Sequence, residues 1–456
     1  MPATLLRNAT VLPMSGSGDA VRRVFDPGSV LFDGDTIVAV GPRDEVDAHP
    51  LARDAVIVDA TGQVLMPGLH NCHMHSGLLR GTAESMSLWD WLEAYVDPAH
   101  RAMTPEIAEA ASLVAYTENL RFGNTSVMDM WRFMEGSAAA ADAVGIRATL
   151  VPYVADEEGY DYFETLDSNL SLLQTHRTAS DGRVRAWVGL EHLLYCSPTC
   201  FRDAMALAEE YDTGLHTHSS ESIWEVQQSL TRFGRRPIEE FYNRGILSER
   251  TVVAHCVWLD DREIELMAQT GTSAVHCPCS NMKLASGPAR VRDMRAAGIA
   301  FGLGSDGEKE NNNLDLFEEM KFASLLQKVS TLDPTIGDPW EVLTMATIEG
   351  ARALGLDDLT GSLEVGKRAD IVMVNLDSIK FVPTFTDANG NGGNVNIAAH
   401  LVFTANGNDV DSVWVDGRRL VAGGEILSVD ETSVMATGQA AAEELFERVA
   451  TTRRQD

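Results

Sequence analysis

Two histidines, His73 and His75, stand two positions apart in the stretch LHNCHMHSG. In a β-strand, residues i and i+2 point to the same face, so the two imidazoles can converge on one point. Imidazole nitrogens are good ligands for zinc and similar divalent ions. The spacing therefore favours a metal site, provided that further ligands reach the same place.

Other histidines and one aspartate close further strand-like runs of the chain. A single buried histidine is usually a satisfied core residue. Seven of the twelve histidines at strand ends, together with an aspartate, are hard to explain by packing, which favours a metal site. These residues are His73, His75, His192, His216, His218, His255, His276 and Asp306.

The candidate metal ligands are His73, His75, His218 and Asp306, because imidazole and carboxylate suit zinc or a similar divalent ion. Glu221 lies three residues beyond His218, where it could carry protons. A thiolate site at the run HCPC (276–279) is a weak alternative, because no second cysteine pair accompanies it.

The position of the first lysine in the chain bears on how many metal ions the site can hold. No lysine precedes Lys283, so the first six strand candidates offer no lysine that could be carbamylated to bridge two metals. One divalent ion is therefore expected, with a carboxylate bridge between two ions as the open alternative. Zinc is the expected ion, and iron or another divalent ion is the alternative.

The elements that must position these residues alternate between apolar strand-like runs and helical patterns. Eight such units predict an α/β fold with a closed (β/α)₈ TIM-like barrel, whose chemistry lies at the C-terminal ends of its strands. A doubly wound open sheet is the alternative, but no G-x-G-x-x-G follows an early strand. The strand candidates are QVLMPGLHNCHMH, NTSVMDM, RATLVPYV, RAWVGLEH, TGLHTHSS, TVVAHCV, TSAVHCP and IAFGLGSD.

Both ends of the chain are rich in short strands separated by glycine and aspartate, which predicts a small β-sandwich built from the two ends. The expected organisation is a β-sandwich domain at 1–62 and 364–430, a barrel at 63–363 and a C-terminal helix at 431–456.

Composition excludes several classes of partner. The net charge of −31 repels nucleic acid and anionic membranes. No apolar run reaches the roughly 18 residues that a membrane span needs, and no secretory signal is recognisable. Six cysteines, several of them inside apolar runs, indicate a reduced, cytoplasmic protein rather than a disulfide framework.

Several motifs together resemble the amidohydrolase superfamily, and within it the aminohydrolase branch of chlorohydrolases and S-adenosylhomocysteine/5′-methylthioadenosine deaminases. The resemblance covers nearly the whole chain, including the split sandwich. The motifs are MPGLHNCHMH, HTHSSE, VVAHCV, HCPCSNMKL, GLGSDGEKENNNLDLFEEM and GSLEVGKRADIVMVN.

The resemblance implies one metal held by His73, His75, His218 and Asp306. It also implies a metal-bound hydroxide that attacks the substrate, with Asp306 accepting the proton of the water. Glu221 matches the glutamate of the branch's H-x-x-E motif and would protonate a ring nitrogen. His255 would hydrogen-bond the hydroxide. A homodimer or larger homo-oligomer is expected from the resemblance alone.

Substrate contacts are less clearly indicated. His192 matches the fourth-strand histidine of the branch, and the seventh-strand motif begins at His276. His100 stands where related nucleoside deaminases have a ribose-binding glutamate. Trp89 is a candidate for an aromatic pocket wall, or for the packed face of a short helix.

The loop after Asp306 is charged in this chain, whereas the branch commonly has small polar residues there. Glu308 or Glu310 could bind an amino or guanidine-like group of a heterocycle, or both could be solvated loop residues.

The sequence therefore predicts a metal-dependent hydrolase acting on C–N bonds other than peptide bonds. The favoured activity is a deaminase that releases ammonia from an adenosine-, guanine- or triazine-like heterocycle. The alternatives are removal of chloride or an alkylamine from a triazine, hydrolysis of an amide-like C–N bond, or a non-enzymatic relative. The complete ligand set disfavours the non-enzymatic alternative.

Overall fold

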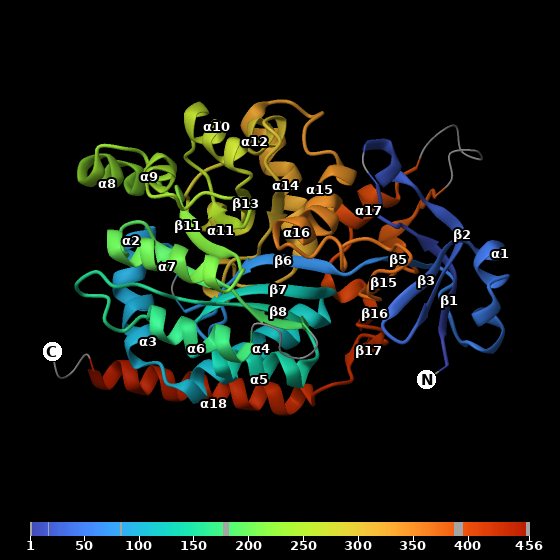
Figure 1. The fold of residues 1–456 in the computed structure, drawn as a ribbon. Coiled ribbons are helices and arrows are strands. Elements are labelled where there is room, and N and C mark those ends of the chain that lie inside the picture. Colours follow the sequence, from blue (N-terminus) through green and yellow to red (C-terminus); the bar gives the residue numbers. More distant parts are fainter. Residues whose placement is uncertain (1, 17, 83, 177–181, 387–394, 453–456) are drawn as a thin grey trace. The chain divides into compact units, whose positions relative to one another are not determined.

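The computed structural model describes residues 2–16, 18–82, 84–176, 182–386 and 395–452 of the chain (Figure 1). Its internal contacts group the chain into two compact units. The terminal unit comprises Met1–Asn71, Asn119–Ser126 and Asp315–Ser428, and the barrel unit comprises Cys72–Glu118, Val127–Leu314 and Val429–Asp456.

The terminal unit is built on a mixed sheet that draws on both ends of the chain, shown by its blue and red strands in Figure 1. Its central strand β5 pairs parallel with β1 and antiparallel with β15, and apolar side chains from both chain ends share one core. The predicted β-rich part made from both ends is confirmed. Its strands, in spatial order, are β18 (Glu425–Ile426), β17 (Arg418–Ala422), β16 (Val410–Val415), β15 (Ile371–Asn375), β5 (Gln63–Pro67), β1 (Thr4–Val11), β2 (Phe25–Asp33) and β3 (Thr36–Pro42), with β4 (Val56–Asp59) beside β1.

The second sheet forms the predicted TIM-like barrel, and all eight predicted strand segments contain one of its strands. The fourth segment is divided at Trp187 into β9, which pairs with β8, and β10, which pairs with β11. One short stretch of chain thus joins the two ends of the strand order. The strands are β6 (Leu69–Met74), β7 (Asn124–Trp131), β8 (Arg147–Pro152), β9 (Val184–Ala186), β10 (Val188–His192), β11 (Leu215–Ser219), β12 (Thr251–His255), β13 (Ser273–His276) and β14 (Phe301–Leu303).

Helices alternate with the barrel strands, and side-chain caps mark where several begin. Ser197, Ser222 and Asp260 accept hydrogen bonds from backbone N–H groups in the first turns of α7, α8 and α10. The helices that follow β6 are α2 (Leu88–Trp91), the π-helix η3 (Leu92–Val96), α3 (Asp97–Ala102), α4 (Pro105–Arg121), α5 (Met134–Val144), α6 (Leu166–His176), α7 (Pro198–Glu210), α8 (Ile223–Phe233), α9 (Pro237–Asn243), α10 (Asp261–Thr270), α11 (Pro278–Lys283), α12 (Val291–Ala296) and α13 (Glu308–Asn311).

The last helix, α18 (Glu431–Thr452), belongs to the barrel unit and packs against α3. Arg448 Nε donates a hydrogen bond of 2.8 Å to the carbonyl oxygen of Ala102. The other helices are α1 (Arg43–Asp47), α14 (Leu316–Thr331), α15 (Pro339–Ala346), α16 (Ile348–Ala353) and α17 (Ile397–Phe403), with short 3₁₀ turns η1 (Gly18–Arg22), η2 (Pro50–Asp54), η5 (Ile379–Phe381) and η6 (Gly407–Asp409).

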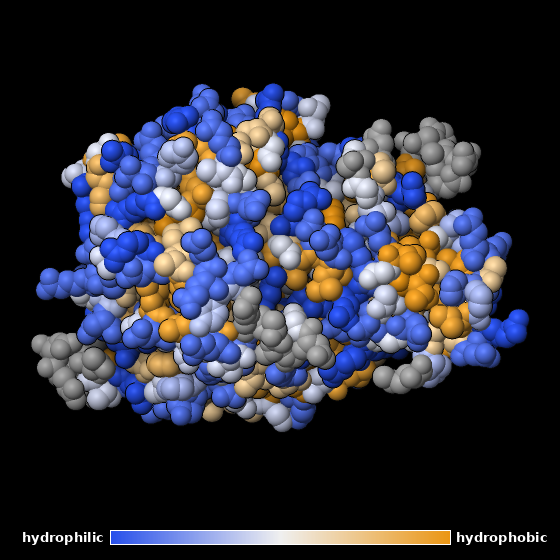
Figure 2. All heavy atoms as spheres, viewed as in Figure 1, coloured by the Kyte–Doolittle hydropathy of each residue, from blue (hydrophilic) through white to orange (hydrophobic). Residues whose placement is uncertain are grey.

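Hydrophilic residues predominate on the face of the molecule drawn in Figure 2. This fits a chain that carries a net charge of −31. Over the described residues, every helix is too short or too polar to cross a membrane.

Truncation of Trp414 tests the shared core of the terminal unit. Trp414 in β16 is 2% exposed and packs with residues from both chain ends. Trp414→Ala should destabilise the protein by about 3–5 kcal/mol, because it leaves a large cavity. Thermal unfolding should then show a Tm lowered by on the order of 10 °C. Val56→Ala, at a side chain that is 51% exposed, is the control. Equal Tm values for the two variants would contradict a core at Trp414.

Candidate metal and active site

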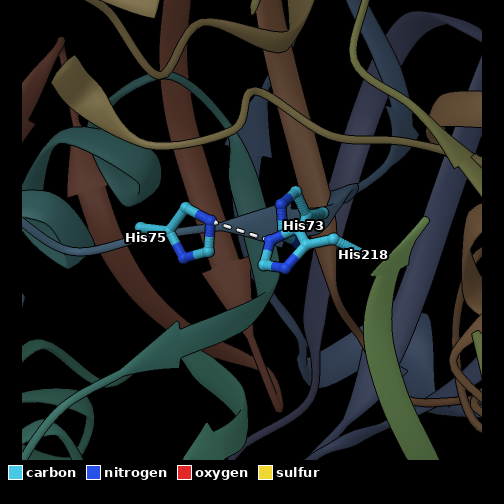
Figure 3. A group of neighbouring side chains, drawn as sticks. All are labelled: His73, His75 and His218. Atoms are coloured by element: carbon cyan, nitrogen blue, oxygen red, sulfur yellow. Dashed lines mark hydrogen bonds between the residues drawn. The ribbon is translucent and has the colours of Figure 1, made fainter. Parts of the chain in front are cut away.

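Three imidazoles and one carboxylate converge at the C-terminal ends of the barrel strands, where a barrel places its chemistry. His73 lies in β6, and His75 is the first residue after that strand. His218 lies in β11, and Asp306 comes three residues after the end of β14. The Nε2 atoms of His75 and His218 are 3.2 Å apart, and Oδ1 of Asp306 lies 3.5 Å from His73 Nε2 and 3.4 Å from His75 Nε2. Figure 3 shows the three rings facing one another.

These separations fit a divalent ion. Two ligands of a tetrahedral zinc ion, each at about 2.0–2.1 Å, stand about 3.3 Å apart. The His73 Nε2 atom is buried and has no hydrogen-bond partner in the protein. A buried polar atom in that state is costly, and a metal ion at the centre of the group would satisfy it. Two groups of side chains in the structure could hold a metal ion, namely His73, His75 and His218, and His73, His255 and Asp306. The assignment of the ion to His73, His75, His218 and Asp306 stays a prediction.

Hydrogen bonds behind the imidazoles fix which nitrogen faces the ion. The Nδ1 of His75 lies 2.7 Å from the carbonyl oxygen of Met130, and the Nδ1 of His218 lies 2.6 Å from that of Glu191. A carbonyl oxygen only accepts, so each Nδ1 must carry the proton. Each Nε2 is then left with a free lone pair, which is the form that binds a metal.

His73 is oriented by a relay through a second histidine. Its Nδ1 lies 2.8 Å from Nε2 of His216, whose own Nδ1 lies 2.9 Å from the carbonyl oxygen of Val252. The carbonyl makes His216 Nδ1 the donor, so its Nε2 accepts the proton of His73 Nδ1. His216 therefore leaves the Nε2 of His73 without a proton, on the side where a metal ion would bind. The spacing His216-Thr217-His218 on one strand was the sequence signal for this shared face.

The protonation states suit metal binding. The pKa of each ligand histidine lies below its usual value, chiefly because burial disfavours the charged form. Burial alone would raise the pKa of Asp306, but its contacts with His73 and His255 outweigh burial and hold that pKa well below its usual range. The site thus offers three neutral imidazoles and one carboxylate anion.

Asp306 is held firmly. It adopts a left-handed backbone conformation with φ of 61°, and its Oδ1 accepts a hydrogen bond of 2.8 Å from the N–H of Gly307. Ser280 Oγ donates a hydrogen bond of 2.6 Å to Oδ2. A β-carbon on Gly304, just after β14, would lie 2.8 Å from the carbonyl oxygen of His73. Glycine at this position therefore lets the segment that carries Asp306 run close beside β6.

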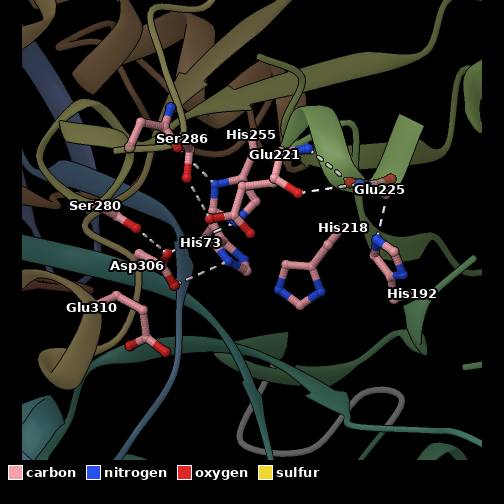
Figure 4. Close-up of polar contacts among 12 residues, drawn as sticks. His73, His192, His218, Glu221, Glu225, His255, Ser280, Ser286, Asp306 and Glu310 are labelled. Carbon is pink, nitrogen blue, oxygen red and sulfur yellow. Dashed lines mark hydrogen bonds and ion pairs between the residues drawn. The ribbon is translucent and has the colours of Figure 1, made fainter. Parts of the chain in front are cut away.

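A glutamate whose side chain is 14% exposed and a buried histidine lie next to the candidate metal ligands (Figure 4). Nε2 of His255 is 3.7 Å from Glu221 Oε2 and 3.8 Å from Asp306 Oδ2. Ser286 Oγ donates to Glu221 Oε1 at 3.0 Å, and His255 Nδ1 lies 3.1 Å from Oδ1 of Asn281. Glu221 and His255 are thus brought together beside Asp306.

The environments of Glu221 and His255 both favour the protonated forms of these groups. Burial raises the pKa of Glu221, although the positive charge of His255 offsets part of the rise. Burial acts to lower the pKa of His255, but the carboxylates of Glu221 and Asp306 outweigh it and the pKa is raised. A carboxyl group and an imidazole side by side can pass protons to and from a bound molecule.

The loop that carries Glu221 is braced by Glu225 in the first turn of α8. Its carboxylate accepts hydrogen bonds from the N–H groups of Ser220 (2.7 Å) and Glu221 (2.8 Å), and it lies 3.1 Å from His192 Nε2. His192 Nδ1 accepts from the N–H of Leu194 at 3.2 Å. Both ring nitrogens of His192 are therefore already engaged with the protein, and its ring stands at the cavity wall. The bracing role of Glu225 was not predicted from the sequence.

A cavity of about 50 Å³ lies over this group. One wall is apolar and aromatic, and the ring of Trp89 packs against that of Trp224 at an interplanar angle of 46°, with ring centroids 4.0 Å apart. The Nε1 atom of Trp89 is buried without a partner. The lining residues are His75, Leu88, Trp89, Trp91, Leu92, Tyr153, Glu191, His192, Tyr195, His218, Glu221, Glu225, His255, Leu284, Asp306 and Glu310.

Two other residues that the sequence predicted to bind substrate are not part of the cavity lining. The described residues that line the cavity do not include His100, in α3, or His276, at the end of β13. His100 is buried and packs against the rings of Trp131, Tyr153 and Phe163. Burial lowers the pKa of His276 to about 3.

The two glutamates after Asp306 are buried. Glu308 is 3% exposed and Glu310 is 6% exposed, so the alternative that both are solvated loop residues is wrong. Glu308 Oε1 accepts a hydrogen bond of 2.9 Å from the N–H of Leu79, whereas Glu310 lines the cavity. Burial raises the pKa of Glu310 to about 8, an effect that Lys309 partly offsets. Lys309 Nζ lies 2.8 Å from Glu310 Oε1.

A His/Asp metal site beside a buried acid and histidine, at the C-terminal rim of a barrel, defines the class of metal-dependent hydrolases. Comparison with known proteins narrows this class. The model of the amidohydrolase family matches residues 64–420, and the chain belongs to that family.

Relatives of known name are similar over nearly the full length. The 5-methylthioadenosine/S-adenosylhomocysteine deaminase of Desulforudis audaxviator is 36% identical over 447 residues, covering 98% of this chain and 99% of the relative. The 5′-deoxyadenosine deaminase of Methanosarcina mazei is 35% identical over 455 residues, covering 98% and 100%. A solved adenosine deaminase from Xanthomonas campestris with bound zinc is 28% identical, with a TM-score of 0.89 and coverage of 97% and 98%.

Removal of the His216 relay should weaken metal binding. In His216→Leu, His73 Nδ1 loses its acceptor and the ring is no longer held in the metal-binding orientation. The zinc affinity should fall about 10- to 100-fold, the usual effect of losing a partner behind a ligand. Titration of the apo-protein with zinc against a competing chelator measures this.

The matched control is His176→Leu, in α6. His176 pairs with Glu135 at 2.6 Å outside the site, so its loss should leave the zinc affinity unchanged. A wild-type zinc affinity in His216→Leu would contradict the relay.

Proposed function

We propose that this protein is a zinc-dependent deaminase of adenosine-type heterocycles. Water adds to the ring carbon that bears the amino group, the C–N bond breaks, and the products are a ring carbonyl compound and ammonia. The observation that carries the proposal is the group of Glu221, His255 and Asp306 on one cavity with an aromatic wall. The full-length similarity to deaminases of modified adenosines supports the same substrate class.

His73, His75, His218 and Asp306 would hold one divalent ion. Such an ion supplies positive charge that lowers the pKa of a water molecule toward neutrality. A single ion is proposed because no lysine on the first six barrel strands could bridge a second one. Zinc is proposed because the donor set suits it and because the similar adenosine deaminase structure contains zinc.

Glu221 is the proposed proton carrier. Burial raises its pKa, which favours the protonated form that a proton donor needs. Glu221 can donate that proton to a ring nitrogen and afterwards pass a proton to the departing amine. The hydrogen bond from Ser286 fixes Oε1 and leaves Oε2 on the side of His255.

His255 and Asp306 are proposed to handle the attacking water. The carboxylate of Asp306 can accept a proton from it. His255 Nε2 lies between the carboxylates of Glu221 and Asp306, so it can donate a hydrogen bond to the oxygen that the ring carbon gains. Trp89 and its neighbours would hold the flat ring in place.

We also propose that the protein works in a reducing cytoplasm as a homo-oligomer. All six cysteines are buried and none of them forms a disulfide, which suits that compartment.

Glu221→Gln separates proton transfer from metal binding. The amide keeps the shape of the side chain but cannot carry the proton, so kcat for ammonia release from 5′-deoxyadenosine should fall about 10²- to 10⁴-fold. Metal content, measured by elemental analysis, should stay at the wild-type value. The matched control is Glu210→Gln at an exposed position of α7.

Wild-type turnover in Glu221→Gln would rule out this proton carrier.

A panel of aminopurines, pterins and chlorotriazines, assayed for both ammonia and chloride, tests the reaction class. Two results together would contradict the proposed function: release of chloride from the chlorotriazines, and no release of ammonia from any adenosine-type compound.

A further inference from the structure

The cavity over the candidate metal site is too small for the substrate proposed above. Its volume is about 50 Å³, and a water molecule takes up about 10–15 Å³ of such a volume, so the cavity has room for about four waters. Pockets that hold a small molecule measure about 300–1,000 Å³. A wall of the cavity must therefore move before a molecule of the size of adenosine can enter.

One wall of the cavity comes from a single short segment, residues 86–96, which we call the cover segment. It contains α2 and the π-helix η3, and four of its side chains line the cavity. Most of the other lining residues lie in barrel strands or shortly after them. Movement of the cover segment would thus enlarge the cavity without moving the strands that carry the candidate metal ligands. The four side chains are Leu88, Trp89, Trp91 and Leu92.

The cover segment has a small apolar cluster of its own. Trp91 is 2% exposed and Val96 is 4% exposed, and all the residues that pack with them belong to the same segment. The side chain of Ser87 caps α2 by accepting a hydrogen bond from the N–H of Asp90. Because these contacts are internal, they persist when the segment moves as a unit.

The chain just before the cover segment is fastened to the charged segment after β14. The N–H of Leu79 donates a hydrogen bond of 2.9 Å to Glu308 Oε1, and that of Gly81 donates one of 2.9 Å to Asn312 Oδ1. Asn312 Nδ2 in turn donates to Glu84 Oε1 at 2.7 Å. These bonds fix the point from which the cover segment starts.

The chain just after the cover segment is also fastened. In α3, the carbonyl oxygens of His100 and Ala102 accept hydrogen bonds from Arg132 (2.6 Å) and Arg448 (2.8 Å). Between the two fixed ends, Ser85 has a left-handed backbone with φ of 60°, which is uncommon for a residue with a side chain. The π-helical turn η3 is a rare form that occurs frequently at functional sites. Both features are suited to absorb a movement of the segment between them.

The cover segment meets α8 through two tryptophans. The ring centroids of Trp89 and Trp224 are 4.0 Å apart. Trp89 lines the cavity and Trp224 is 39% exposed, so this contact lies between the cavity and the solvent. Trp89 Nε1 is buried and has no hydrogen-bond partner among the described residues. Separation of the two rings therefore breaks no hydrogen bond of the Trp89 side chain.

We propose that the cover segment is a lid over the active site, and that the contact between Trp89 and Trp224 holds the lid closed. The inference rests on the proposed function, because that function sets the size of the molecule that must enter. Opening admits the substrate to the candidate metal site. Closure excludes bulk water and brings Trp89 to the bound ring.

Stopped-flow fluorescence tests whether opening precedes binding. The zinc-loaded Glu221→Gln protein is mixed with rising concentrations of 5′-deoxyadenosine, and tryptophan emission reports association. The observed rate should level off at high concentration, because it is then limited by opening of the lid.

Trp224→Ala, made in the same Glu221→Gln protein, removes the closing contact without touching a candidate metal ligand. The limiting rate should rise about three- to tenfold, the effect expected from the loss of one aromatic pair. Trp224→Phe keeps a ring at this position and should stay within about twofold of the parent protein. The matched control is Tyr242→Ala, at a side chain in α9 that is 48% exposed. Rates that are proportional to concentration throughout and equal with and without Trp224→Ala would overturn the lid.

Loss of zinc to a chelator tests the lid without any adenosine compound. Dipicolinate reaches the ion through the cavity, so zinc loss should be about three- to tenfold faster in Trp224→Ala than in the wild type or Tyr242→Ala. The zinc affinity should stay unchanged. This result supports the lid even if 5′-deoxyadenosine neither binds nor releases ammonia, which would count against the proposed function alone. Equal rates of zinc loss, or a faster loss that a weaker zinc affinity fully explains, would show that the segment is a fixed wall.

Discussion

The site depends on the burial of bare imidazole lone pairs that face one another. The Nδ1 atoms of His75 and His218 are committed to carbonyl oxygens, so their Nε2 atoms meet at 3.2 Å with no proton between them. Such an arrangement is unfavourable unless a cation lies between the lone pairs. The backbone carbonyls therefore do more than support the ligands, because they create a demand for positive charge that only a metal ion or an added proton can meet.

The barrel makes this arrangement possible from residues far apart in the sequence. Parallel strands end at one rim, so side chains from β6, β11 and β12 and from the segment after β14 meet there without long loops. Close approach of Gly304 to His73 keeps Asp306 within reach of the ligands. The same rim carries Glu221, whose loop is fixed by Glu225 from the following helix. Adjacent parts of one framework thus position the candidate metal ligands and the proposed proton carrier.

Strands and shared strand faces follow from local sequence pattern and could be predicted. Hydrogen-bond partners and burial depend on tertiary contacts, and fewer of them could be predicted. Alternating apolar runs predicted all eight barrel strands, and the H-x-H spacing predicted that His73 and His75 share a face. The spacing of His216 and His218 indicates a shared face, but the hydrogen-bond partners of His216 and Ser280 are brought close only by folding. The burial of Glu308 and Glu310 was equally hidden, because a charged loop is usually solvated, and here Leu79 and Lys309 supply partners for it.

The acidity of the chain extends from its composition into its active site. A net charge of −31 disfavours the approach of anions and favours that of cations, including the metal ion itself. Inside the cavity, Asp306 lies 3.4 Å from His75 Nε2, and Glu225 is paired with His192. Burial raises the pKa of Glu191 and of Glu310 to about 8, so both carboxyl groups hold a proton more readily than exposed acids do. The exposed acids therefore carry most of the long-range negative charge of the chain, whereas burial limits the negative charge inside the cavity.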